Sequence, residues 1–372
     1  MKYHNPIITG FHPDPSVCRV GNDFYLVNSS FEYFPGIPIY HSTDLTHWEQ
    51  IGHVLDRKNQ LKLVSGAPNC LGIYAPTIRY HEGIFYCIVT NVGGRSGGNF
   101  FVYTTDPYGR WSNPVKLPFA GIDPSLFFDE DGRIYYTGTD TGIYIAEITF
   151  DVVRNDTPKR NELPVSIQNV KCGEKHYIWN GSGGNNPEGP HLYRIHDMYY
   201  LMIAEGGTEY CHMVTIARSK NVYGSYEACP HNPVLSNRST CLNIKAIGHA
   251  DLVEDSQGSW WAVCLGIRPL GYPFRHNLGR ETMLAPVKWE NGWPVMGDNG
   301  TVTETFEVET APGKKTRKSD FYIPGSNMTD TFCSNKLHPS WNTIYTPVSK
   351  FVKPTKQGLS LCAYDTTLSD DK

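Results

Sequence analysis

One phrase recurs five times along this 372-residue chain and constrains its fold more than any other feature. Each copy has a small residue or a proline step, an apolar run, a turn with glycine, aspartate or asparagine, and then an aromatic-rich segment. The copies begin at Asp14, Ala75, Asp123, Gly189 and His249. Successive starts lie about 48 to 66 residues apart, a spacing that suits the blades of a β-propeller. The repeat therefore predicts five similar β units around a shared axis.

Each copy is followed by a second stretch that is also typical of short antiparallel strands. These outer halves occupy residues 37–52, 100–117, 142–151, 213–227 and 281–296. The 35 glycines, 26 prolines and 13 % aromatic residues fit many short strands joined by tight turns. No stretch shows a sustained helical period. We therefore expect an all-β fold, a five-bladed β-propeller with four strands per blade.

The composition changes after about residue 300, which indicates a second domain. We assign residues 1–310 to the propeller and the polar, basic residues 311–325 to a linker. Residues 326–372 are predicted to form two or three strands, and a piece of this size has too small a core to fold alone. Either it packs on the propeller or it is part of an incomplete second domain, and we favour the second alternative.

Charge and composition exclude several classes of partner. The net charge is −4 and there is no basic block, so nucleic acid is not an expected partner. No apolar run approaches the roughly 20 residues that span a bilayer. The first residues lack the apolar core of a signal peptide, which favours a cytoplasmic protein. Three of the ten cysteines, Cys18, Cys87 and Cys264, lie in apolar strand segments and are expected to be buried free thiols.

Three carboxyl groups fall at or beside the repeated slots, at one end of the predicted axis. They are Asp14, Asp123 and Glu188. An isolated Asp-Pro is usually a turn or a strand cap, but two Asp-Pro-Ser phrases in equivalent slots favour a shared site. Hydrolysis of a glycosidic bond needs one ionised and one protonated carboxyl. Asp14 is predicted to be the general base, Glu188 the acid with a raised pKa, and Asp123 the residue that holds Glu188.

Other candidates keep more than one interpretation. Arg280 precedes a strand and is either a surface ion-pair partner or a cation that grips sugar hydroxyls near the carboxylates. His249 is a core hydrogen-bonding group, a substrate contact or an axial metal ligand. Phe31, Tyr74 and Thr208 lie on loops beside the inner strands, where aromatic faces either pack the blades or stack on a sugar. Residues 129–131 are expected to form a solvated hairpin turn.

At these residues the chain resembles glycoside hydrolase family 43, in its β-xylosidase / α-L-arabinofuranosidase branch. The matching phrases include NPIITGFHPDPS, GIYAPTIRYHEG, GIDPSLFFDEDGR, NPEGPHLY, IGHADLV and HNLGRETMLAPV, and they run in order through residues 5–300. The resemblance implies a five-bladed β-propeller and an inverting hydrolysis, with Asp14 as base, Asp123 as pKa modulator and Glu188 as acid. It also implies a substrate pocket formed by Phe31, Tyr74, Thr208 and Arg280.

The resemblance carries further expectations and two departures. His249 resembles an axial histidine that lies near calcium or water in some relatives, and no cofactor is otherwise required. Tyr74 stands where tryptophan is common, which bears on sugar preference. The segment DTFCSNKLHPSWNTIYTPV resembles the start of a C-terminal β-sandwich that relatives carry complete. Relatives with the full sandwich often associate, so a homo-oligomer is also an expectation.

Together these features predict an exo-acting glycosidase. It would remove terminal β-D-xylose, and also α-L-arabinofuranose, from short xylo-oligosaccharides. Two alternatives stay open from the sequence. One is a propeller that only binds pentose oligosaccharides because its second domain is truncated, and the other is an endo-acting arabinanase with an open groove.

Overall fold

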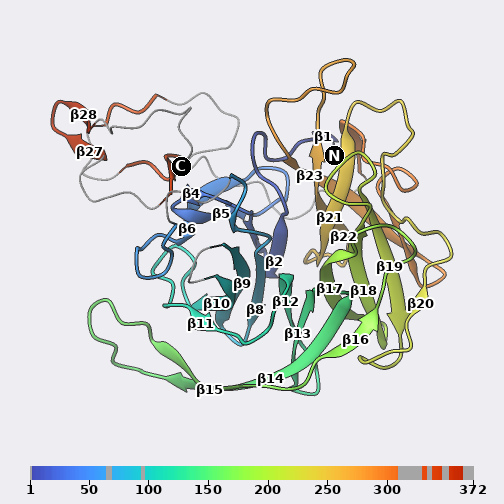
Figure 1. Ribbon diagram of the computed structural model, residues 1–372, viewed down its shortest axis with the longest axis horizontal. Coiled ribbons are helices and arrows are strands. Elements are labelled where there is room, and N and C mark those ends of the chain that lie inside the picture. Colours follow the sequence, from blue (N-terminus) through green and yellow to red (C-terminus); the bar gives the residue numbers. More distant parts are fainter. Residues whose placement is uncertain are drawn as a thin grey trace.

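The predicted all-β five-bladed propeller is confirmed by a computed structural model of the chain (Figure 1). The structure describes residues 2–63, 69–93, 97–308, 329–332, 337–345 and 352–362. Five antiparallel sheets of four or five strands follow one another along the chain, and the part of the chain just specified contains no helix. No helix capable of crossing a membrane is therefore found in these ranges.

The strands of each blade run outward from the axis in chain order. Blade one contains β2 (Ser16–Val20), β3 (Asp23–Val27), β5 (Gly36–Ser42) and β6 (Glu49–Leu55). Blade two contains β8 (Thr77–His81), β9 (Ile84–Val92), β10 (Gly98–Thr104) and β11 (Val115–Lys116), and the short β7 (Gly72–Ile73) also pairs with β9. Blade three contains β12 (Ile122–Phe128), β13 (Ile134–Thr139), β14 (Ile143–Arg154), β15 (Val165–Cys172) and β16 (His176–Trp179).

The last two blades have four strands each. Blade four contains β17 (Glu188–Ile195), β18 (Met198–Glu205), β19 (Met213–Ser219) and β20 (Glu227–Ala228). Blade five contains β21 (Lys245–Glu254), β22 (Trp260–Ile267), β23 (Glu281–Glu290) and β24 (Trp293–Met296). The innermost strands β2, β8, β12, β17 and β21 each contact the next, and β21 contacts β2, so the ring is closed around one axis (Figure 1).

The N-terminal segment helps to close the ring against blade five. Strand β1 (Lys2–His4) pairs with β25 (Thr305–Glu307). The side-chain amide of Asn5 donates to the Leu284 carbonyl at 2.9 Å and its oxygen accepts from the Leu284 amide at 2.8 Å. Because these groups lie 279 residues apart in the chain, the pairing links the two ends of the propeller directly.

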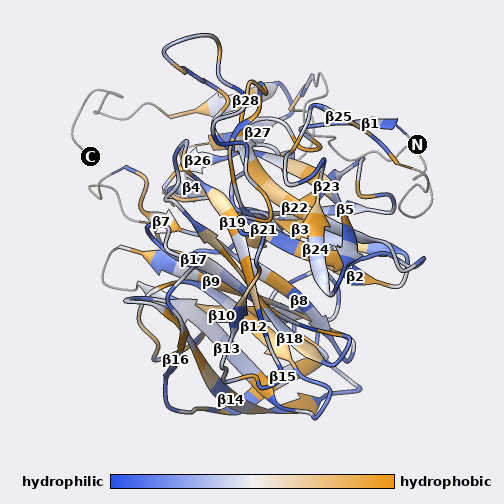
Figure 2. Ribbon diagram, turned by 90° about the vertical axis from the view of Figure 1, so that its right-hand side faces the viewer, coloured by the Kyte–Doolittle hydropathy of each residue, from blue (hydrophilic) through white to orange (hydrophobic). Residues whose placement is uncertain are grey.

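The core consists of apolar clusters between adjacent blades. Hydrophobic residues concentrate along the strands and hydrophilic residues along the connecting loops (Figure 2). Val27 of blade one packs in one cluster with Cys87 of blade two, and Phe101 of blade two packs in another with Tyr136 of blade three. Cys18, Cys87 and Cys264 are buried and free, which confirms the prediction for these thiols. Burial of these side chains stabilises each blade only when its neighbours are present.

The expected solvated turn at residues 129–131 is wrong for its first residue. Glu130 and Asp131 are exposed, but Asp129 is 4 % exposed. Its carboxylate accepts from the Tyr199 hydroxyl at 2.7 Å and from Arg194 Nη1 at 3.2 Å, both in blade four. The buried charge is tolerated because these partners replace water. Because both partners belong to blade four, the turn links blade three to blade four.

The segment after the propeller is described only in parts. The predicted linker, residues 311–325, lies outside the described residues. Strand β26 (Thr343–Ile344) pairs with β4 (Tyr33–Phe34) on blade one, and β27 (Val352–Thr355) pairs with β28 (Gly358–Leu361). The division into propeller, linker and partial β-sandwich stays a prediction.

Candidate active site

Four of the five repeated slots, in blades one, three, four and five, share one backbone irregularity. Asp14, Asp123, Gly189 and His249 have positive φ angles of 52°, 54°, 60° and 47°. The pairing register shifts at the start of β12, β17 and β21, which are the inner strands of blades three, four and five. A bulge of this kind re-aims a side chain that would otherwise follow the pleat. Four of the five slots that are equivalent in the sequence therefore share a backbone conformation, whereas Ala75 in blade two does not have a positive φ.

Asp14 is a buried carboxylate held by a cation and a hydroxyl. Arg280 Nη1 donates to its Oδ1 at 2.8 Å, and the Ser29 hydroxyl donates to its Oδ2 at 2.6 Å. Burial by itself would raise the pKa of Asp14, but Arg280, His249 and Ser29 outweigh that effect, and the net shift lowers the pKa. Asp14 is therefore ionised at neutral pH, as a general base must be.

Glu188 is in the opposite electrostatic state. Glu188 is the first residue of β17 and directly follows a long segment rich in glycine and asparagine. Burial raises the pKa of Glu188, and the negative charge of Asp14 raises it further, while Arg280 and a hydrogen bond from the Thr208 hydroxyl act in the other direction. The outcome is a carboxyl that holds its proton well above the usual pH range for glutamate.

Asp123 is held by a backbone amide next to Glu188. Its Oδ2 accepts the Gly189 amide at 2.9 Å, so it is bonded to the residue that follows Glu188. Burial raises the pKa of Asp123; His249 opposes this shift, and the charges of Glu188 and Asp14 add to it. Gly189, next to Glu188, is hydrogen-bonded to Asp123 and packs on the His249 ring, which lies 3.9 Å from Asp14 Oδ1, so the structure brings Asp14, Asp123 and Glu188 into one site.

The predicted pocket residues surround these carboxyl groups. The Arg280 guanidinium lies 5.4 Å from the centre of the Phe31 ring, and the Phe31 and Tyr74 rings are 5.3 Å apart. Phe31 is fixed through its backbone, since its amide donates to the Ile73 carbonyl at 2.8 Å. Gly72 is required beside it, because a Cβ at that position would lie 2.2 Å from the Phe31 carbonyl oxygen. The structure thus places Arg280, Phe31 and Tyr74 beside Asp14, and Thr208 beside Glu188. Their roles in substrate binding stay predictions.

The structure adds two residues that the sequence did not indicate. One is Ser29, the hydroxyl partner of Asp14. The other is His212, a buried imidazole whose Nε2 lies 3.8 Å from Glu188 Oε1. Burial lowers the pKa of His212 to about 3, so the ring is neutral. It packs on Gly248, where a Cβ would lie 2.3 Å from His212 Nδ1. Neither residue belongs to a repeated phrase, so no sequence signal marked it.

The site around His249 does not fit a calcium ion held directly by protein. His249 Nδ1 lies 3.9 Å from Asp14 Oδ1, and its ring packs on Gly189. Calcium takes six to eight oxygen ligands, whereas Asp14 is already engaged by Arg280 and Ser29. Among the described residues, no group of three or more His, Cys, Asp or Glu side chains is arranged to hold a metal. The side chains near His249 thus do not support the expectation of a calcium ion there.

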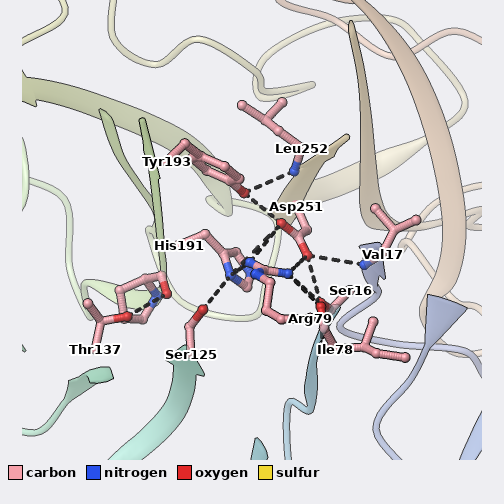
Figure 3. Close-up of polar contacts among 11 residues, drawn as sticks. Ser16, Val17, Ile78, Arg79, Ser125, Thr137, His191, Tyr193, Asp251 and Leu252 are labelled. Carbon is pink, nitrogen blue, oxygen red and sulfur yellow. Dashed lines mark hydrogen bonds and ion pairs between the residues drawn. The ribbon is translucent and has the colours of Figure 1, made fainter. Parts of the chain in front are cut away.

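A second polar cluster lies deeper between the inner strands (Figure 3). Its centre is Asp251 of blade five, which accepts from Arg79 Nη1 of blade two at 2.8 Å and from the Ser16 hydroxyl of blade one at 2.6 Å. The Tyr193 hydroxyl of blade four donates to the same carboxylate at 2.6 Å. Arg79 Nη2 also lies 2.9 Å from His191 Nδ1. We call Asp251, Arg79, His191, Tyr193 and Ser16 the axial hub.

A cavity of about 350 Å³ opens near the hub, at the opposite end of the inner strands from the acids. Residues 17–19, 79–81, 126–128, 192–194 and 252–254 line it, together with Trp260. It includes none of the predicted site residues. The chemistry therefore belongs to the end of the axis where the carboxyl groups meet.

Comparison with known proteins gives concordant matches. The family model described as "Glycosyl hydrolases family 43" matches residues 3–294. The chain is 45 % identical over 362 residues to "Non-reducing end alpha-L-arabinofuranosidase BoGH43B" of Bacteroides ovatus, covering 95 % of this chain and 65 % of the relative. It is 46 % identical over 316 residues to "Xylosidase/arabinosidase" of Butyrivibrio fibrisolvens, covering 82 % and 59 %. The chain thus spans less than two thirds of the length of these relatives.

Solved structures agree with the sequence matches. The structure titled "Bacteroides ovatus Xyloglucan PUL GH43B" superposes with a TM-score of 0.85 at 41 % identity, covering all of this chain and 70 % of the other. A xylan beta-1,4-xylosidase from Bacillus halodurans superposes with a TM-score of 0.81 at 34 % identity, covering 98 % and 69 %.

Proposed function

The chain belongs to family 43 of the glycosyl hydrolases, and from this premise we propose that it hydrolyses terminal β-D-xylosyl and α-L-arabinofuranosyl residues of short oligosaccharides. One observation carries the proposal. Two carboxyl groups of opposite pKa shift, Asp14 lowered and Glu188 raised, interact in a single buried site. Glycoside hydrolysis needs this combination of one ionised and one protonated carboxyl.

In the proposed mechanism Asp14 removes a proton from water as the water attacks the anomeric carbon. Glu188 gives its proton to the leaving oxygen in the same step. Inversion requires the two carboxyl groups to be roughly 6.5–9.5 Å apart, so that a water fits between them and the sugar. Activity should therefore fall as pH drops through the lowered pKa of Asp14, and also as pH rises through the raised pKa of Glu188.

The remaining residues support these two steps. Asp123 fixes the backbone beside Glu188 and, when ionised, discourages Glu188 from losing its proton. Arg280 keeps Asp14 ionised and adds donors for sugar hydroxyls. Phe31, Tyr74 and Thr208 shape the pocket, and His249 lies beside Asp14, with its Nδ1 3.9 Å from Asp14 Oδ1. No step in this mechanism uses a metal ion.

The names of the relatives support the choice of pentoses as substrates. One is called an arabinofuranosidase that acts at non-reducing ends and another a xylosidase/arabinosidase. Terminal pentoses of the two kinds offer similar hydroxyl positions to one pocket. Association into a homo-oligomer and a cytoplasmic location are part of the same proposal and await measurement.

The test is proton NMR of the first product formed from xylobiose. An inverting enzyme should release α-xylose first, before mutarotation. The Asp14→Asn variant should lose this signal, whereas Asp131→Asn, which changes an exposed aspartate outside the site, should keep it. Initial release of β-xylose would contradict the roles given to Asp14 and Glu188. Failure to cleave both xylobiose and an arabinofuranoside would contradict the function.

A further inference from the structure

A group of exposed apolar side chains lies on the connection between β22 and β23. Tyr272 is 91 % exposed and Leu270 is 74 % exposed, and Phe274 and Leu278 are exposed as well. Single exposed apolar residues are normal on a protein surface. A contiguous group of them often marks a binding surface. The segment ends at Arg280, the partner of Asp14.

A second loop joins this group from blade four. The Tyr210 hydroxyl donates to the Phe274 carbonyl at 2.6 Å, and the two rings are 5.2 Å apart. The Tyr272 and Phe274 rings are 6.1 Å apart and nearly perpendicular. Lys245 Nζ lies 5.8 Å from the Phe274 ring. We call Tyr210, Tyr272 and Phe274 the aromatic platform.

Both loops of the aromatic platform also carry residues of the catalytic site. Thr208 stands two residues before Tyr210 and donates a hydrogen bond to Glu188. Arg280 stands six residues after Phe274 and pairs with Asp14. The Tyr210 loop follows β18, the strand paired with the one that begins at Glu188. The two loops therefore connect the platform to both acids, through Thr208 beside Glu188 and through Arg280 beside Asp14.

We propose that the aromatic platform binds the sugars that follow the scissile bond, as a subsite for the leaving part of a xylo-oligosaccharide. The apolar face of a pyranose packs on an aromatic ring, and tyrosine hydroxyls add hydrogen bonds at its edge. The hydrogen bond between Tyr210 and Phe274 orders two of the rings before a ligand arrives, which reduces the entropy lost on binding. The inference rests on the proposed glycosidase function and specifies which substrates it prefers.

The test compares two substrates with the same terminal sugar. Xylotriose presents two sugars beyond the scissile bond, and methyl β-D-xyloside presents a single methyl group. The variants are Tyr272→Ala and Phe274→Ala, with Tyr80→Ala as a matched control, because Tyr80 is an exposed tyrosine that lines the cavity at the other end of the axis. We expect each platform variant to reduce kcat/KM for xylotriose roughly 3- to 10-fold, mainly through KM. Values for methyl β-D-xyloside should stay unchanged.

The remaining outcomes also decide the question. An equal loss on both substrates, or no loss on either, would overturn the platform as a sugar subsite. A change in molar mass by light scattering of Tyr272→Ala, with unchanged preference for xylotriose, would make it a contact between two copies and overturn the inference. If the unaltered chain cleaves neither substrate, the proposed function fails, and calorimetric binding of xylotriose decides the subsite alone: a loss of binding in Tyr272→Ala supports it and unchanged or absent binding rejects it.

Discussion

Two buried aspartates lie on inner strands of the same propeller, but their surroundings are opposite. Asp251 in the axial hub is paired with Arg79 and also accepts from Ser16, Val17 and Tyr193, so its pKa is held far below the usual range in spite of burial. Asp123 accepts one backbone amide, from Gly189, and burial raises its pKa, with the charges of Glu188 and Asp14 adding to the shift.

The difference indicates that one end of the inner strands stabilises the fold and the other end carries the candidate active site. The hub carboxylate is fully satisfied, and a satisfied buried ion pair holds neighbouring elements in place. At the other end of the axis, Asp123 and Glu188 have too few partners to offset their burial, which is unfavourable for folding but leaves their protonation states adjustable. Perturbed carboxyl groups of this kind are therefore better evidence of a functional site than burial of charge alone.

The largest expected effect is on catalysis at the site of Asp14 and Glu188. Asp14→Asn and Glu188→Gln should each lower kcat by about 10²–10⁴-fold, because general acid–base groups contribute that much. Both variants should keep the fold, since each replacement retains the shape of the side chain. Steady-state kinetics on xylobiose together with thermal melting would check both statements, and near-normal kcat in either variant would remove that residue from its role.

The second expected effect is on stability at the hub. Asp251→Ala leaves Arg79 buried without its partner, so the free energy of unfolding should fall by about 3–5 kcal/mol. The double variant Asp251→Leu/Arg79→Met removes both charges and should be more stable than Asp251→Ala. Chemical denaturation of the three proteins would measure this, and a double variant no better than the single one would contradict the ion-pair account.

A third effect concerns the ring that packs beside Glu188. Gly248→Ala places a Cβ 2.3 Å from His212 Nδ1, and such overpacking typically costs about 1–3 kcal/mol. Because the ring must move relative to Glu188, kcat should fall as well. In a His212→Ala background the same change should cost much less, which is the non-additivity expected of two groups in contact. Additive losses in calorimetry would show that His212 is not the obstructing group.

The smallest effect is the pH dependence of stability. The folded pKa of Asp123 is raised, so the folded state binds this proton more tightly and stability is lost as pH rises above the ordinary value of about 3.9. Asp251 has a lowered pKa, so its contribution is lost as pH falls below that value. At pH 8, Asp123→Asn should therefore be more stable than the unaltered chain by about 1 kcal/mol or more, since one pKa unit corresponds to about 1.4 kcal/mol. A lower melting temperature for Asp123→Asn at pH 8 would contradict this sign.

Much of the site could be predicted from the sequence, because the same position in each repeat lies at the same end of the propeller axis. The phrase at Asp14 and Asp123, with Glu188 before a third copy, was enough to predict the acids and the end of the axis at which they meet. Arg280, Phe31, Tyr74 and Thr208 were identified by resemblance, and the structure places them around those acids. Their roles in substrate binding stay predictions.

Other features depend on partners far away in the chain. The burial of Asp129 depends on Arg194, 65 residues later, and the state of Asp251 depends on Arg79, 172 residues earlier. His212 bears no local mark of its position beside Glu188.

The sequence by itself determined the number of blades, their all-β character and the slots of the candidate acids, because strand pattern and turn chemistry are local properties of the backbone. Only the tertiary structure decided which carboxyl groups are paired with an arginine, as Asp14 and Asp251 are, and which are not, as Asp123 is not. That outcome depends on burial and on charges brought together from different blades, and neither can be read from neighbours in the chain.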